Sequence, residues 1–78
     1  INWKRNMEKV YNCSVKLLNG KWVTYHSVNH LGKFVKFIDS KEWLFFNVYD
    51  KKDKSKSNDI LASYQNGKNR NVPTGKHI

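Results

Sequence analysis

Residues 10–28 read VYNCSVKLLNGKWVTYHSV, and this stretch decides the expected fold. Its first half alternates apolar and polar side chains, which is the period of a strand with one buried face. Asn19-Gly20 then precedes a second run that is rich in aromatic and β-branched residues. An Asn-Gly pair favours a type I′ turn, in which both central residues have positive φ. The stretch therefore predicts a β-hairpin with a two-residue loop.

A two-residue loop also predicts which residues of the hairpin lie opposite one another. The expected pairs are Leu17 with Trp22, Val15 with Thr24, Cys13 with His26, and Tyr11 with Val28. This register places most apolar side chains of the hairpin on one face, as a sheet with one buried face requires.

The chain beyond the hairpin predicts two further strands and a helix. Residues 33–39 and 43–49 are apolar runs separated by a polar turn, and the second is apolar on both faces, which is typical of a central or covered strand. Its rings Trp43, Phe45 and Phe46 are expected in the core. Ile60, Leu61 and Tyr64 share one face of a helix that would end at Asn66-Gly67.

These elements predict a mainly β fold with some helix. We expect a four-stranded antiparallel meander or a small SH3-like barrel, followed by a short C-terminal helix and a flexible basic tail. Residues 1–9 would form an irregular or short helical lead-in. Residues 10–67 would form a single small β-rich domain, and residues 68–78 a basic mobile tail.

The charge balance points to a class of partner. The chain has 78 residues, with 15 lysines and arginines against 6 acids, and a formal net charge of +9. Such a surface attracts polyanions before specific contacts form. Lysine greatly outnumbers arginine, and this favours loose phosphate contact over bidentate reading of bases. A lysine- and asparagine-rich composition is also what an AT-rich genome produces without selection for binding.

Lysines and aromatic residues together predict the candidate site. Ammonium groups that follow phosphates and rings that stack on bases are the chemistry of single-stranded nucleic-acid binding. The expected phosphate contacts are Lys51, Lys52, Lys54, Lys56, Lys68 and Arg70. Trp22 or Tyr25 would supply the stacking surface. The alternative interpretations are a solvated loop for the lysines and the hydrophobic core for the rings.

Cys13, His26 and His30 form a second candidate cluster, because the expected register sets Cys13 across from His26. A histidine beside a cysteine can activate a thiolate, and the three residues could supply metal ligands. The chain is short for a catalytic pocket, and a structural zinc site uses four ligands. The sequence therefore favours a non-enzymatic protein without a metal or cofactor. A single cysteine weakly favours a reducing compartment such as the cytoplasm.

Residues 33–62 carry a basic residue and an apolar strand, a short turn and a second apolar strand, then Lys51-Lys52 and a helix from Asp59. This pattern resembles the C-terminal half of RelE/HigB-type ribonuclease toxins. In that family a similar Lys-Lys stretch lies near the bound RNA, so the resemblance implies RNA contacts for Lys51 and Lys52. The N-terminal helical region of the family has no counterpart in residues 10–28, and Asp50 interrupts the usual basic run.

The sequence leaves other binding functions open. Small basic aromatic β modules also bind anionic cell-wall polymers or proteins, as bacterial SH3-like domains do. A structural component of a ribonucleoprotein would have the same composition. No apolar run is long enough for a transmembrane helix, so no membrane partner is expected. The expected function is binding of RNA or single-stranded DNA with low sequence specificity.

Overall fold

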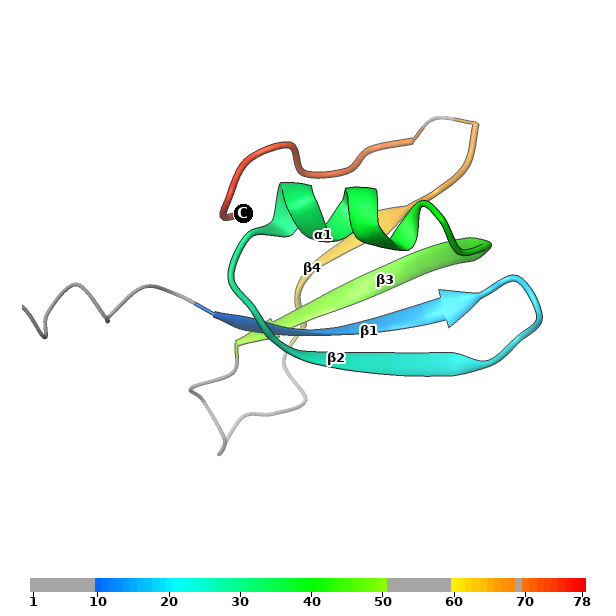
Figure 1. Cartoon of the computed structure of the whole chain (residues 1–78), viewed down its shortest axis with the longest axis horizontal. Coiled ribbons are helices and arrows are strands. Elements are labelled where there is room, and N and C mark those ends of the chain that lie inside the picture. Colours follow the sequence, from blue (N-terminus) through cyan, green and yellow to red (C-terminus); the bar gives the residue numbers. More distant parts are fainter. Residues whose placement is uncertain (1–9, 51–59, 69) are drawn as a thin grey trace, which may run out of the picture.

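One antiparallel sheet with a helix across one of its faces makes up the described chain (Figure 1). The computed structural model describes residues 10–50, 60–68 and 70–78. In chain order the elements are β1 (Tyr11–Leu17), β2 (Trp22–Val28), α1 (Leu31–Ile38), β3 (Trp43–Asp50) and β4 (Ile60–Gln65). The strand order in the sheet is β2-β1-β3-β4, so β1 and β3 are central and β2 and β4 are the edges.

The mainly β class, with four antiparallel strands and one short helix, is confirmed. The meander is wrong, because a helix rather than a strand follows β2 and carries the chain across the sheet to β3. The predicted C-terminal helix is also wrong, since Ile60–Gln65 pairs with β3 as an edge strand. The sheet is open, so the described strands do not close into the SH3-like barrel given as an alternative.

The β1–β2 hairpin is confirmed, but its turn differs from the predicted one. The backbone N–H of Gly20 donates to Leu17 O at 2.9 Å, and the N–H of Leu17 donates to Lys21 O at 2.8 Å. Gly20 has a φ of 90°, and Asn19 does not have positive φ. The loop is therefore a three-residue turn with glycine in the left-handed position, a common alternative to the two-residue type I′ loop.

The extra loop residue shifts the hairpin register by one along most of β1. The observed pairs are Lys16 with Trp22, Val15 with Val23, Ser14 with Thr24, and Cys13 with Tyr25. A β-bulge then restores the predicted pairing of Tyr11 with Val28. The bulge includes Ser27, whose φ of 63° is left-handed. The predicted pairing of Cys13 with His26 is consequently wrong.

The helix α1 forms because its apolar residues recur at helical spacing. Leu31, Phe34, Val35 and Ile38 are buried, while Lys33 and Lys36 are exposed on the other side. Positions i, i+3, i+4 and i+7 form one stripe of a helix. The stripe packs onto β1 and β3 in a single hydrophobic cluster.

Every backbone N–H in the first turn of α1 has an acceptor. The N–H groups of Leu31 and Gly32 donate to the carbonyls of Lys76 and Gly75, at 3.0 and 2.8 Å. His30 caps the helix, because its Nδ1 accepts the N–H of Lys33 at 3.2 Å. Helix starts leave such donors without intrahelical partners, so these contacts complete the helix.

The chain after β4 therefore lies against α1 in the described part, residues 70–78 (Figure 1). Val72 packs on the hydrophobic cluster, and the Tyr11 hydroxyl lies 3.4 Å from His77 Nδ1. The sequence separated residues 68–78 as a mobile tail, and composition alone gave no sign of these contacts. The domain boundaries and the mobility of this segment stay predictions.

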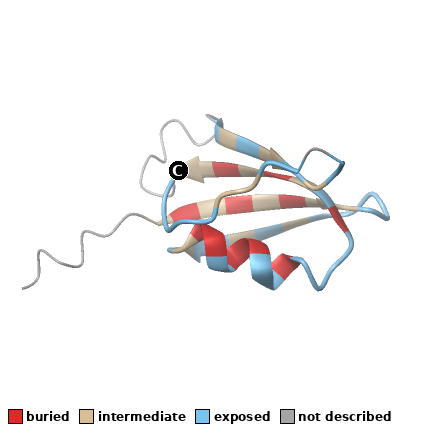
Figure 2. Cartoon of the chain, turned by 90° about the horizontal axis from the view of Figure 1, so that it is seen from above, coloured by how far each residue is buried: buried red, intermediate tan, exposed pale blue. Residues whose placement is uncertain are grey.

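The core lies between the sheet and α1 (Figure 2). Buried residues alternate with more exposed ones along β1 and the second half of β3, as expected for strands with one covered face. Trp43 and Phe46 are buried as predicted. Phe45 is only partly buried and faces the opposite side, so its predicted place in the core is wrong.

Candidate functional site

The sheet face turned away from α1 is the strongest candidate for a binding surface. The cross-strand pairs place these side chains on it: Asn12, Ser14 and Lys16 of β1, Trp22 and Thr24 of β2, Phe45, Asn47 and Tyr49 of β3, and Ser63 and Gln65 of β4. We call this set the open face. Its central-strand residues remain partly exposed, and among the described residues it holds no acidic side chain. An antiparallel sheet commonly leaves one face to solvent, and Trp22 is the most exposed of the three rings on this one.

Two aromatic rings meet over a lysine at one end of the open face. Lys16 lies between its neighbours Trp22 and Phe45 in one cross-strand row. The ring centroids of Trp22 and Phe45 are 5.5 Å apart and nearly perpendicular, at 84°. Lys16 Nζ lies 5.1 Å from the centre of the Trp22 ring. Edge-to-face packing and the cation fix the indole while 49% of Trp22 stays exposed.

A row of hydroxyl and amide groups crosses the middle of the same face. Ser14 Oγ and Thr24 Oγ1 are 3.0 Å apart, and Ser63 Oγ donates to Asn47 Oδ1 at 2.7 Å. Ser14 and Asn47 are direct cross-strand partners, so the row spans all four strands. Tyr49 lies beyond the row, four residues after Phe45 and about 13 Å away at the usual rise of a strand. The open face thus places polar donors and acceptors between two aromatic positions.

The two predicted stacking residues lie on opposite sides of the sheet. Trp22 is on the open face, whereas Tyr25 faces α1 and packs edge-to-face on Phe34 and Phe37, at 5.3 and 5.5 Å between centroids. Trp22 and Tyr25 are three positions apart, and residues an odd number of positions apart in a strand lie on opposite faces. Only Trp22 can therefore contribute to a surface on the open face.

The predicted phosphate contacts are not gathered by the structure into one cluster. Lys51, Lys52, Lys54 and Lys56 lie outside the described residues. Lys68 is exposed after the end of β4, at the same end of the sheet as Trp22. Asp50 and Ile60, which flank the undescribed segment, lie at the opposite end.

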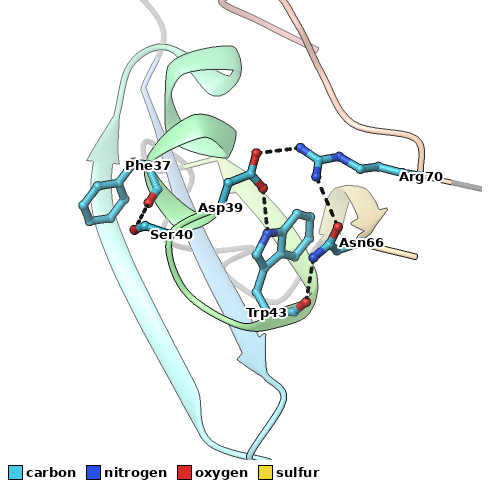
Figure 3. Close-up of polar contacts among 6 residues, drawn as sticks. All are labelled: Phe37, Asp39, Ser40, Trp43, Asn66 and Arg70. Carbon is cyan, nitrogen blue, oxygen red and sulfur yellow. Dashed lines mark hydrogen bonds and ion pairs between the residues drawn. The ribbon is translucent and has the colours of Figure 1, made fainter. Parts of the chain in front are cut away.

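Arg70 takes part in a network of side chains beside α1 (Figure 3). Its guanidinium is 2.8 Å from Asp39 Oδ2 and donates to Asn66 Oδ1 at 3.2 Å. Trp43 Nε1 donates to the other carboxylate oxygen of Asp39, and Asn66 Nδ2 donates to the Trp43 carbonyl. A phosphate would have to compete with Asp39 for this arginine. Its observed role is to join the segment after β4 to the end of α1.

Acid is expected to weaken this network. The Arg70 hydrogen bond holds the pKa of the Asp39 carboxyl below its usual value of 3.8. A carboxyl with a lowered pKa in the folded state stabilises the fold above its unfolded-state pKa, and that contribution is lost as pH falls through the folded-state pKa. The pair is partly exposed, so Asp39→Asn should lower the free energy of unfolding by at most about 1 kcal/mol at neutral pH.

Urea unfolding of wild type and Asp39→Asn, at neutral pH and in a series of acid buffers, measures this effect. The difference between the two proteins should shrink once the pH passes below the usual aspartate pKa. Arg70→Gln should show the same loss of acid dependence. A difference that is equally large at neutral and strongly acid pH would contradict the ionic origin of the contact.

Cys13 and the histidines do not form a reactive cluster. The Cys13 side chain is fully buried under α1, and burial raises the pKa of its thiol to about 12. His26 is exposed, with its Nδ1 3.2 Å from Asn12 Oδ1 on the open face. The one-residue change of register separates the thiol from this imidazole. Among the described residues, no group of three histidine, cysteine or acidic side chains could hold a metal ion.

Sequence reasoning missed Lys16, Phe45, Asn47 and Tyr49 as members of the candidate surface. Their signal was alternation: residues 45, 47 and 49 share a face of the strand, as do 12, 14 and 16. The chain around 43–49 was apolar enough to suggest two covered faces. Only the side on which α1 packs, which the sequence did not reveal, separates the core residues from the exposed ones.

Within the described residues, no helix has the length and apolar character needed to cross a membrane. The strand predicted at Lys33-Phe34-Val35 is part of α1, so the element order differs from the pattern that suggested the toxin resemblance. The chain matches no protein-family model, no curated protein and no solved structure in the comparisons made with each.

Proposed function

We propose that the protein binds single-stranded nucleic acid, RNA or DNA, through the open face and with little sequence preference. The observation that carries this proposal is the exposed Trp22 ring, held by Phe45 and Lys16 on an uncovered sheet face. Four-stranded sheets that bind single strands use exposed rings as platforms for two or three bases. Stacking tolerates any base, because every base has a π-face.

The remaining features of the open face fit the same ligand. Ser14, Thr24, Asn47 and Ser63 offer hydroxyl and amide groups to sugars and base edges between the rings. Lys16 supplies a cation, and the net charge of +9 supplies the long-range attraction. Lys51, Lys52, Lys54 and Lys56 remain proposed phosphate contacts on sequence grounds. The proposal includes no chemical step and no cofactor.

Removing the Trp22 ring is expected to weaken binding. Trp22→Ala should raise the dissociation constant for a 12-nucleotide single strand by about 5- to 150-fold, because stacking on one base contributes about 1–3 kcal/mol. Fluorescence anisotropy of an end-labelled strand without a terminal phosphate measures this at two salt concentrations. Ile78→Ala is the control, since Ile78 is an exposed apolar residue, at 59%, that lies in the segment 70–78 and not on the open face.

Three results would contradict the proposal. The first is duplex DNA binding as tightly as the single strands. The second is an equal loss for Trp22→Ala and Ile78→Ala, which would remove the open face from the site. The third is equal binding to a teichoic-acid-like polymer that salt abolishes, which would favour general attraction or a cell-wall polymer instead.

A further inference from the structure

A concave surface lies on the other side of the sheet from Trp22, between the end of β2 and α1. It is a groove of about 290 Å³ that Tyr25, Phe34 and Phe37 line on the apolar side. Asn29, His30 and Lys33 line it on the polar side. The segment 70–78 contacts α1 at its first turn through Gly75 and Lys76, yet neither of these residues lines the groove.

The apolar side of the groove is a cluster of rings that meet mainly by their edges. Tyr25 lies 5.3 Å from Phe34 at 71°, and 5.5 Å from Phe37 at 86°. Phe34 is buried, whereas 51% of Phe37 is exposed. The exposed half of Phe37 is therefore the part of the cluster that a further flat ring can contact.

The polar side of the groove is positive. Lys33 is the one lysine among the described residues that line the groove. Lys41 does not line the groove, but its Nζ lies over the Phe37 ring, 5.2 Å from the ring centre. The lining contains no acidic residue. His30 Nδ1 accepts the Lys33 N–H, so the neutral ring carries its proton on Nε2 and can donate a hydrogen bond from there. A ligand that fits joins a flat ring to an anionic group.

The bulge in β2 argues against an added peptide strand as the occupant. Ser27 lines the groove with left-handed backbone, and the bulge interrupts the regular edge that strand addition requires. A strained conformation of a residue other than glycine beside a groove is typical of binding sites. Asn29 adds an amide donor and acceptor, which matches the edge of a nucleobase and has no counterpart on a phenyl ring.

We infer that this groove binds one free nucleoside monophosphate, with its base against Tyr25 and Phe37 and its phosphate beside Lys33. The volume is at the lower limit for small-ligand sites, which suits one nucleotide and not a dinucleotide. The groove lies on the other side of the sheet from Trp22, although His26 belongs to both regions, because it lines the groove and contacts Asn12. The inference can be tested apart from the proposed function, because Trp22 does not line the groove.

The inference is tested by titrating the full chain with AMP and measuring binding by isothermal titration calorimetry and by the shifts of the amide NMR signals. We expect saturable binding with shifts at Asn29 and Lys33. Removing the stacking ring in Phe37→Ser should weaken binding about tenfold. Lys33→Gln should weaken it about two- to fivefold, as for an exposed ion pair. Lys36→Gln is the matched control, because Lys36 is exposed on α1 but does not line the groove.

The probes separate the parts of the ligand. Adenosine and ribose 5-phosphate should each bind more weakly than AMP, and inorganic phosphate should bind most weakly. AMP binding no tighter than ribose 5-phosphate would overturn the inference, as would equal losses for Lys33→Gln and Lys36→Gln. Tighter binding of phosphotyrosine would also overturn it, in favour of a protein ligand. Trp22→Ala should leave AMP affinity unchanged while weakening single-strand binding.

Discussion

Phe46→Ala is expected to remove about 3–5 kcal/mol from the free energy of unfolding, as truncation of a buried phenylalanine typically does. Phe46 is fully buried and contacts rings from three elements. Its centroid lies 5.3 Å from Phe34, 5.4 Å from Trp43 and 5.3 Å from Tyr64. A domain of this size has about 4–12 kcal/mol of stability in total, so the variant should lose between about a quarter and all of it.

The neighbouring residue gives the matched control. Phe45→Ala removes the same atoms from the next position of β3, but on the open face, where Phe45 contacts Trp22. We expect a loss below about 1.5 kcal/mol, near the value of an aromatic pair, and weaker binding of single strands. Urea unfolding followed by circular dichroism measures both variants, and Phe46→Leu provides a form that stays folded. Equal destabilisation by Phe45→Ala and Phe46→Ala would contradict the assignment of the two faces.

The second large effect is expected at Gly32, where alanine should destabilise the protein by about 2–3 kcal/mol. In an ordinary helix the same change stabilises by up to about 1 kcal/mol, because alanine is the better helix former. Here a Cβ at position 32 would lie 2.4 Å from Thr74 O and 2.7 Å from Thr74 C. Both are backbone atoms, so the clash can be relieved only by moving the chain around Thr74.

Gly75→Ala is the control for Gly32→Ala, because a Cβ at position 75 would meet nothing within 4 Å. Urea unfolding gives the stability, and hydrogen exchange at Leu31 and Gly32 reports whether their bonds to Lys76 and Gly75 survive. Stabilisation by Gly32→Ala would show that the helix does not need the segment 70–78 in this position. If the variant is destabilised but the Leu31 amide stays as protected from hydrogen exchange as in wild type, the strain lies elsewhere.

The first half of the sheet was predictable because its signal is local. Alternation in β1 and the Asn19-Gly20 turn predict the hairpin, and a continuous apolar run predicts the central place of β3. The register failed by one residue, since Asn-Gly also fits a three-residue loop in which only the glycine has positive φ. That single residue decided whether the cross-strand partner of Cys13 is His26 or Tyr25.

The sequence predicted a strand where α1 forms and a helix where β4 forms, and both errors have physical reasons. Phe34, Val35 and Ile38 are aromatic and β-branched, so their composition favours a strand, and Gly32 suggested a turn. The spacing from Leu31 to Ile38 carried the helical signal, but its N-terminal donors are completed by residues that are distant in sequence. Conversely, Ala62 and Tyr64 alternate with Ser63 and Gln65 and pair with β3, although Ile60, Leu61 and Tyr64 also fit a helix.

The sequence predicted residues for a binding site but not where they lie in the fold. Trp22 was predicted to stack on bases, and the structure shows that it is exposed on the open face; its stacking stays a prediction. Tyr25 could not be distinguished from it, because the covered side of an edge strand depends on where α1 packs. Arg70 was predicted to contact phosphate, and no residue near it in the sequence indicates that it pairs with Asp39.

The carbonyls of Gly75 and Lys76 also set an order of events during synthesis. The first turn of α1 emerges from the ribosome long before these two residues, and until they arrive the N–H groups of Leu31 and Gly32 can bond only to water. Pairing of β1 with β3 must also wait until the long segment between them, which contains β2 and α1, has been made. The hairpin of β1 and β2 is the one part of the described fold that needs only its own residues. The nascent chain is therefore expected to hold a hairpin early and to fix its helix only when translation has passed residue 76.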